Sequence, residues 1–65
     1  MRIIYQGTDE ETSATTVATF LESKGIAAGT AVIEYQGTIH APGDRLDLPL
    51  IEGSTLNAFR IVAGG

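Results

Sequence analysis

The sequence predicts an α+β fold in which a single β-sheet packs against one helix. Three observations lead to this prediction. Strand-forming stretches stand at both ends of the chain, one amphipathic helical stripe follows the first of them, and two short strand-like stretches lie between. Two layers are the minimum that buries the apolar stripe of one helix. Because 65 residues suit one domain, we expect residues 1–65 to form a single domain.

The first predicted strand covers residues 1–6. Its alternation places Ile3 toward the core and Ile4 on the opposite face. Gly7 and Asp9 favour a hairpin turn into a short second strand. The two glutamates that follow Asp9 are typical of a solvated sheet edge, where charge discourages pairing with another chain.

A helix is predicted from Thr15 or Thr16 to about Lys24. Threonine is a favourable residue at a helix N-terminus, because its side-chain oxygen accepts a free backbone N–H. Gly25 suits the left-handed conformation that ends many helices. The expected buried stripe follows the i, i+3, i+4 spacing and consists of Val17, Phe20 and Leu21.

The middle of the chain predicts a second hairpin and then an irregular crossover. Residues 31–35 form a strand, Gln36–Gly37 a tight turn, and residues 38–40 a returning strand. Pro49 excludes a central strand from the stretch that follows. The final strand is expected from about Thr55. Three alternating leucines of the crossover are expected to close the bottom of the core: Leu46, Leu48 and Leu50.

A docking patch is predicted on the outer face of the sheet. If Leu56 faces the core, alternation turns Phe59 outward on the final strand. Ile4 and Val32 also point outward, on strands expected to lie nearby. An exposed aromatic side chain beside two aliphatic ones commonly marks a partner site. The alternative is that the crossover covers Phe59.

The closing residues 62–65, Val-Ala-Gly-Gly, are expected to form a flexible tail. Two glycines bury no side chain and lose the most backbone entropy on ordering, so their use is not structural. Extended, four residues reach ~13 Å, enough to enter a narrow channel in a partner. We therefore expect Gly65 to bear the functional carboxylate, with Val62, Ala63 and Gly64 as the part that fits the channel. A frayed end or an expression remnant is the alternative.

Composition argues against several other classes of function. The formal net charge is −4 and the isoelectric point about 4.5, so the basic stripe of a nucleic-acid-binding protein is missing. Without cysteine there is no thiolate metal site, and His40 alone cannot make one. The sequence contains no apolar run of membrane-spanning length and no secretory signal, which predicts a cytoplasmic protein without a membrane partner. The four cations are scattered: Arg2, Lys24, Arg45 and Arg60.

The predicted order of elements, followed by Gly-Gly, resembles the ubiquitin-like β-grasp fold, a mixed β-sheet packed on one helix. The segment from Glu52 to Gly65 is similar to the end of the sulfur-carrier proteins of thiamin biosynthesis. The dipeptide Thr16-Val17 at the start of the helix and residues 35–39, Tyr-Gln-Gly-Thr-Ile, add to this resemblance.

The resemblance implies a carrier that is a protein substrate and not an enzyme. Its Gly65 carboxylate would be adenylated with ATP by an activating enzyme related to those that activate ubiquitin. It would then become a thiocarboxylate, with sulfur from a cysteine-desulfurase-type donor, and deliver that sulfur to thiazole synthase. Gly64 would pass the narrowest part of the enzyme channel. No cofactor would be bound stably.

Some residues depart from the family pattern and leave the pathway open. The step at residues 40–42 is His-Ala-Pro, Ser54 stands where aspartate is common, and Ala58 is small for an inward position. Similar carriers serve molybdopterin synthase and specialised sulfur-containing metabolites. A ubiquitin-like modifier joined through Gly65 to lysines of other proteins, and an adaptor with an inert tail, are the remaining alternatives.

Overall fold

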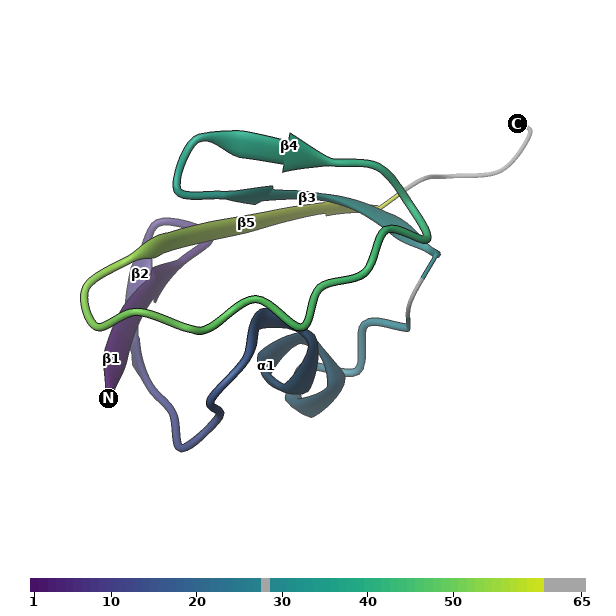
Figure 1. Ribbon diagram of the computed structural model, residues 1–65. Coiled ribbons are helices and arrows are strands. Elements are labelled where there is room, and N and C mark those ends of the chain that lie inside the picture. Colours follow the sequence, from purple (N-terminus) through teal and green to yellow (C-terminus); the bar gives the residue numbers. More distant parts are fainter. Residues whose placement is uncertain (28, 61–65) are drawn as a thin grey trace.

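A five-stranded mixed β-sheet lies on one side of a single short helix in the computed structural model, which describes residues 1–27 and 29–60 (Figure 1). The predicted α+β class is confirmed. The strand order across the sheet is β2-β1-β5-β3-β4. The elements are β1 (Arg2–Tyr5), β2 (Thr8–Glu11), α1 (Val17–Ser23), β3 (Ala31–Tyr35), β4 (Thr38–His40) and β5 (Thr55–Arg60).

Strand β5 is the centre of this sheet. It runs parallel to β1, with Ile4 opposite Thr55, and antiparallel to β3, with Val32 opposite Phe59. The two hairpins, β1–β2 and β3–β4, are antiparallel and flank it. The last described strand is therefore paired on both sides.

The same four residues, Tyr-Gln-Gly-Thr, make the turn of both hairpins, at 5–8 and at 35–38. Both glutamines have φ 52°, and the glycines that follow have φ 81° and 83°. Two consecutive residues with positive φ match the twist of the flanking strands, and glycine at the second position meets no steric penalty.

The sequence prediction for the first hairpin was wrong in two details. Asp9 lies within β2, opposite Ile4, and the turn itself is Gln6–Gly7. Glu10 is opposite the buried Ile3, so it belongs to the helix side of the sheet and is not a fully solvated edge residue. Asp9 is a common turn residue, and that preference placed the turn too late.

The start of α1 is capped as predicted. Thr16 has an extended backbone, and its side-chain oxygen accepts the N–H of Thr19 at 3.1 Å. Lys24 is the C-terminal cap, and Gly25 follows with φ 76°. The predicted stripe is confirmed, because its three members are buried: Val17, Phe20 and Leu21.

The crossover between β4 and β5 supplies acceptors that the helix lacks. The first helical N–H groups, those of Val17 and Ala18, donate to the carbonyls of Leu48 at 3.0 Å and Leu46 at 2.8 Å. These amides have no partner inside a helix. In return, the Leu50 N–H donates to the Thr15 carbonyl at 2.9 Å. The crossover therefore serves as part of the helix cap.

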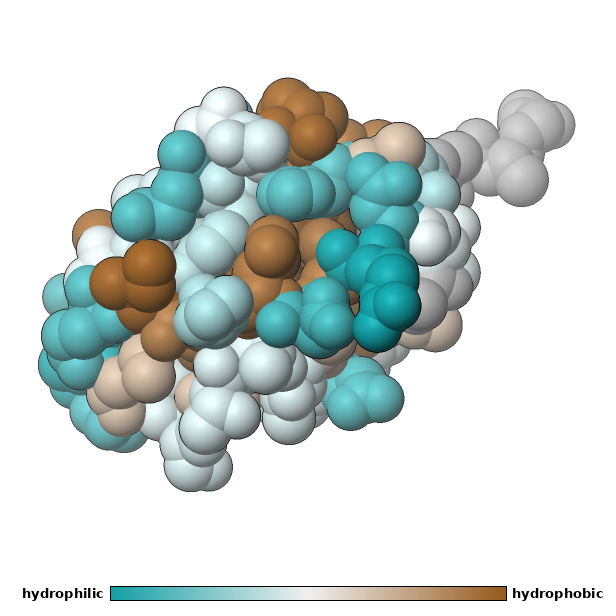
Figure 2. Space-filling view, viewed as in Figure 1, coloured by the Kyte–Doolittle hydropathy of each residue, from teal (hydrophilic) through white to brown (hydrophobic). Residues whose placement is uncertain are grey.

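The core lies between the sheet and α1 and is closed by the crossover, as predicted. Leu50 is buried, while Leu46 and Leu48 are half-buried against the same cluster. Figure 2 shows apolar surface between the sheet and the crossover. Ser54 is also buried, and its hydroxyl has no hydrogen-bond partner among the described residues. The largest fully buried apolar side chains are Phe20, Ile3, Leu56 and Val17.

Candidate functional site

The predicted reactive segment, Val62, Ala63, Gly64 and Gly65, lies outside the described residues. The described part of the site is the strand that precedes it. That strand, β5, is paired with β1 at Thr55 and Leu56 and with β3 up to Arg60, which is opposite Ala31. The segment therefore follows the central strand of the sheet.

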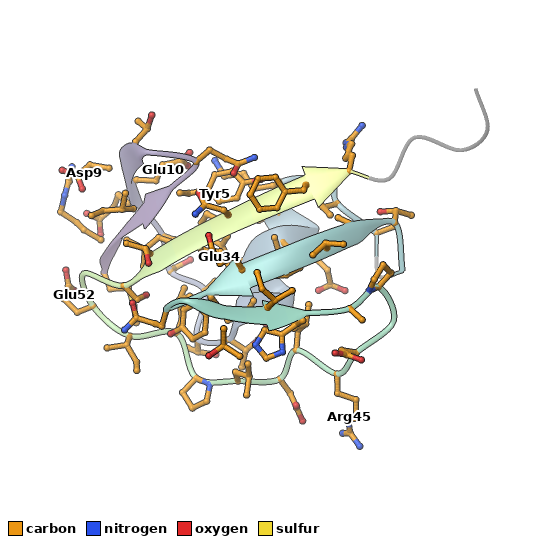
Figure 3. The ribbon with its side chains drawn as sticks, turned by 90° about the horizontal axis from the view of Figure 1, so that it is seen from above. Tyr5, Asp9, Glu10, Glu34, Arg45 and Glu52 are labelled. Atoms are coloured by element: carbon orange, nitrogen blue, oxygen red, sulfur yellow. The ribbon has the colours of Figure 1, made fainter. Side chains whose placement is uncertain are left out.

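The face of the sheet opposite α1 has no second layer among the described residues, and Figure 3 looks onto this face. Its side chains alternate with those of the core: Val32 and Glu34 point outward while Ile33 is buried. We call this side the open face. Its central members are Ile4, Val32, Glu34, Ile39, Asn57 and Phe59.

Phe59 and Val32 are directly opposite each other on the open face. Phe59 is 55% exposed, as alternation predicts. The crossover packs on the other side of the sheet and does not cover it (Figure 1). An aromatic and a β-branched side chain in this relation stabilise a strand pair and together present an apolar surface.

Ile4 lies on the open face but apart from this pair. Its partner is Thr55, four positions before Phe59 on β5, which is about 13 Å along the strand. The predicted three-residue patch is therefore not contiguous. The apolar residue that sequence reasoning omitted is Ile39 of β4, which is 61% exposed and lies opposite Glu34.

A polar pair occupies the middle of the open face. Asn57 donates its side-chain N–H to Glu34 at 3.0 Å, and both residues are half-buried. They are directly opposite each other on β5 and β3. Glu34 is labelled near the centre of the sheet in Figure 3. This pair separates Ile39 from Ile4 on the open face.

Both turn glutamines hold β5 in position. Gln6 binds the backbone of Ala58 through its side-chain amide, and Gln36 accepts the N–H of Thr55 at 3.0 Å. Sequence reasoning missed this role. The repeated Tyr-Gln-Gly-Thr was the available signal, because one turn sequence at two hairpins implies one local geometry.

Charged side chains of both signs lie at each end of the described part of the molecule. Asp9, Glu10 and Glu52 lie toward one end of the molecule and Arg45 toward the other (Figure 3). Glu10 is ion-paired with Lys24, whose ammonium group also lies 5.5 Å from the ring centroids of two aromatic residues, Tyr5 and Phe20.

The described part of the chain has neither a metal-binding cluster nor a membrane-spanning helix. It holds no group of three or more side chains that could bind a metal ion, and His40 is half-buried on β4. None of its helices is long and apolar enough to cross a membrane. A scan against models of known protein families and a search of curated protein sequences each found no match.

Proposed function

We propose that this chain is a sulfur-carrier protein with the ubiquitin-like β-grasp fold, in which Gly65 carries sulfur as a thiocarboxylate. The observation that carries the proposal is the sequence Val-Ala-Gly-Gly, which follows the central strand β5 almost directly. The end of this strand is held by its pairing with β3 up to Arg60 and by the Gln6 side chain at Ala58. Thiazole synthase is the sulfur acceptor that the resemblance favours.

The arrangement of the sheet supports the β-grasp assignment. The resemblance implies a mixed sheet on one helix. The parallel pairing of β1 with β5, beside two antiparallel hairpins, makes the sheet mixed, and α1 packs on one of its faces.

Adenylation and sulfur transfer require no catalytic group from the carrier itself. A carboxylate is a poor acyl donor until one oxygen becomes part of a good leaving group. In adenylation that oxygen attacks the α-phosphorus of ATP and releases pyrophosphate. The persulfide of a cysteine-desulfurase-type donor then displaces AMP and forms an acyl disulfide. A thiol of the partner enzyme cleaves its S–S bond, which releases the thiocarboxylate and leaves a disulfide on the partner. The activating enzyme supplies the charge stabilisation for these steps, and the carrier contributes position.

The pair of Phe59 and Val32 is the proposed contact for the activating enzyme. Phe59 stands two positions before residue 61, so the contact and the reactive segment are close along the chain. A contact so near the reacting end restricts where that end can reach. The side chain is already exposed and needs no rearrangement to be buried by a partner.

The environment of Lys24 favours a carrier over a modifier that forms chains of itself. It is the single lysine of the sequence. Its ammonium group is ion-paired with Glu10 and lies beside the rings of Tyr5 and Phe20. An acceptor lysine must reach an acyl group on another molecule, and these contacts hold the ammonium group against its own domain.

The test is the intact mass of the protein isolated from its native cell. We expect the C-terminal peptide to end at Gly65 and part of it to show an oxygen-to-sulfur exchange. In reconstitution with the cognate activating enzyme, deletion of Gly65 should leave folding intact and abolish ATP-dependent adenylation. Unchanged adenylation after that deletion would contradict the proposal.

A further inference from the structure

The two edges of the sheet differ in charge. The outer strand β2 contains three carboxylates, at Asp9, Glu10 and Glu11. The opposite outer strand, β4, contains Thr38, Ile39 and His40, with no carboxylate and no permanent cation. Charged side chains on an edge strand discourage pairing with another strand. In the described sheet, β2 has this protection and β4 does not.

The turn geometry determines which backbone groups β4 presents. In a two-residue hairpin the flanking residues, Tyr35 and Thr38, form the hydrogen-bonded pair. Antiparallel pairs alternate between bonded and non-bonded, so the next pair, Glu34 and Ile39, is non-bonded. The N–H and C=O of Ile39 therefore point away from β3, toward the free edge.

A groove lies beside this edge, on the helix side of the sheet. It has a volume of about 400 Å³ and runs between β4 and the crossover, where Figure 2 shows apolar surface. Its wall is fixed by the Tyr35 hydroxyl, which donates to the Pro49 carbonyl at 2.8 Å and accepts the Ile51 N–H at 3.0 Å. The lining includes Tyr35, Thr38, His40, Leu48, Pro49 and Ile51.

We infer that β4 and this groove bind an extended peptide segment of a partner protein as a sixth strand. The residue opposite Ile39 exchanges two backbone hydrogen bonds with it. Its two neighbours then point to the helix side, into the groove, because side chains alternate along a strand. The groove lining carries no formal charge, so these two side chains are apolar.

The charges around the groove select the flanks of the peptide. The wall of the groove runs along the crossover between Asp47, which is ion-paired with Arg45 at 3.2 Å, and Glu52, and the whole chain has a net charge of −4. The segment bound is therefore apolar at its centre and cationic at its ends. This surface is separate from the open face, so the inference does not depend on the proposed sulfur chemistry.

The probe is an acetylated and amidated heptapeptide, Lys-Ser-Val-Thr-Val-Ser-Lys, titrated into the full chain and followed by nitrogen–proton correlation spectra. We expect saturable shifts at Thr38, Ile39 and His40 and at Ile51. Methylation of the central threonine nitrogen removes the hydrogen bond to the Ile39 carbonyl and should weaken binding about tenfold. Equal binding of the methylated peptide, or shifts centred on Phe59, would overturn the inference.

Two matched variants distinguish peptide binding in the groove from peptide binding on the open face. Ile51 is 53% exposed and Phe59 is 55% exposed, so truncation of either leaves the core intact. Ile51→Ala should weaken peptide binding about fivefold or more, because the apolar wall is lost. Phe59→Ala should leave it unchanged. A reversed order, no saturable shift, or a concentration-dependent dimer through β4 without peptide would each contradict the inference.

Discussion

The side-chain amide of Gln6 binds both backbone groups of Ala58, donating to its carbonyl at 2.9 Å and accepting its N–H at 3.1 Å. Strand β1 ends at Tyr5, where the chain turns away. The amide therefore takes the place of a further β1 residue in the parallel ladder. It holds β5 two positions before the end of its described range, next to the proposed docking residue Phe59.

Gln6→Asn tests this contact, because asparagine tolerates positive φ but is one methylene too short to reach Ala58. The two lost hydrogen bonds should lower the free energy of unfolding by about 1–3 kcal/mol in denaturant titration. Gln36→Asn is the matched control, since Gln36 makes one side-chain bond, to Thr55, at an exposed position. An equal loss in both variants would show that the amide of Gln6 has no special role.

Tyr35→Phe tests how the crossover is attached. The hydroxyl binds Pro49 and Ile51 together, so its removal leaves one acceptor and one donor without a protein partner. We expect a loss of about 1–3 kcal/mol in stability and faster hydrogen exchange at the Ile51 amide. Unchanged exchange at Ile51 would mean that the crossover is held without this hydroxyl.

Ser54→Ala should stabilise the domain or leave it unchanged. The hydroxyl is buried without a hydrogen-bond partner among the described residues, a state that costs about 1–3 kcal/mol. Thermal unfolding should shift upward by a few degrees or stay constant. Ser54→Asp, the residue common in the resembled family, should destabilise, because it buries a charge. A clear loss of stability in the alanine variant would contradict this account.

The sequence predicted those elements whose pattern is local. The bounds of β3 and β4 were read from the alternation of residues 31–35 and from the Gln36–Gly37 turn, and the Thr16 cap was one of two candidates. The β3–β4 hairpin and the helix cap each depend on residues within a few positions of each other. A local preference also gave one wrong prediction. Aspartate is common in turns, so the first turn was predicted to include Asp9, whereas it is Gln6–Gly7.

The position of Ile4 could not be predicted, because it depends on register between distant segments. Alternation gives the face on which a side chain lies and not its neighbour along the partner strand. The parallel pairing of β1 with β5 places Ile4 beside Thr55 and away from Phe59. The hydrogen bonds from the crossover to α1 were missed for the same reason, since an irregular segment carries no periodic signal.

Phe59→Ala tests the proposed contact with the activating enzyme. Binding should weaken by ~1–3 kcal/mol if Phe59 is an anchor, while the melting temperature stays nearly unchanged because the side chain is exposed. Ile51→Ala, of similar exposure on the other side of the molecule, is the control and should bind normally. A large drop in stability with intact binding would assign Phe59 a structural role instead.

Gly64→Ala separates the geometry of the closing segment from its chemistry. The variant keeps Gly65 and the net charge but adds a methyl group and disfavours positive φ. The described core consists of residues before position 61, so stability should change by less than ~0.5 kcal/mol. Adenylation or sulfur transfer should fall by up to ~100-fold, because small displacements of a reacting group are costly. Ala63→Gly is the control; parent rates in the alanine variant would show that the diglycine is not a steric requirement.

The hydrogen bonds that cap α1 determine when this protein can fold during its synthesis. A seven-residue helix does not persist alone in water, and the acceptors for Val17 and Ala18 are the carbonyls of Leu48 and Leu46. Those carbonyls are translated about thirty residues after the helix itself. A nascent chain that has emerged only through β4 already holds every helical residue, yet it lacks the groups that complete the helix. Folding of the N-terminal half must therefore wait for the crossover to leave the ribosome.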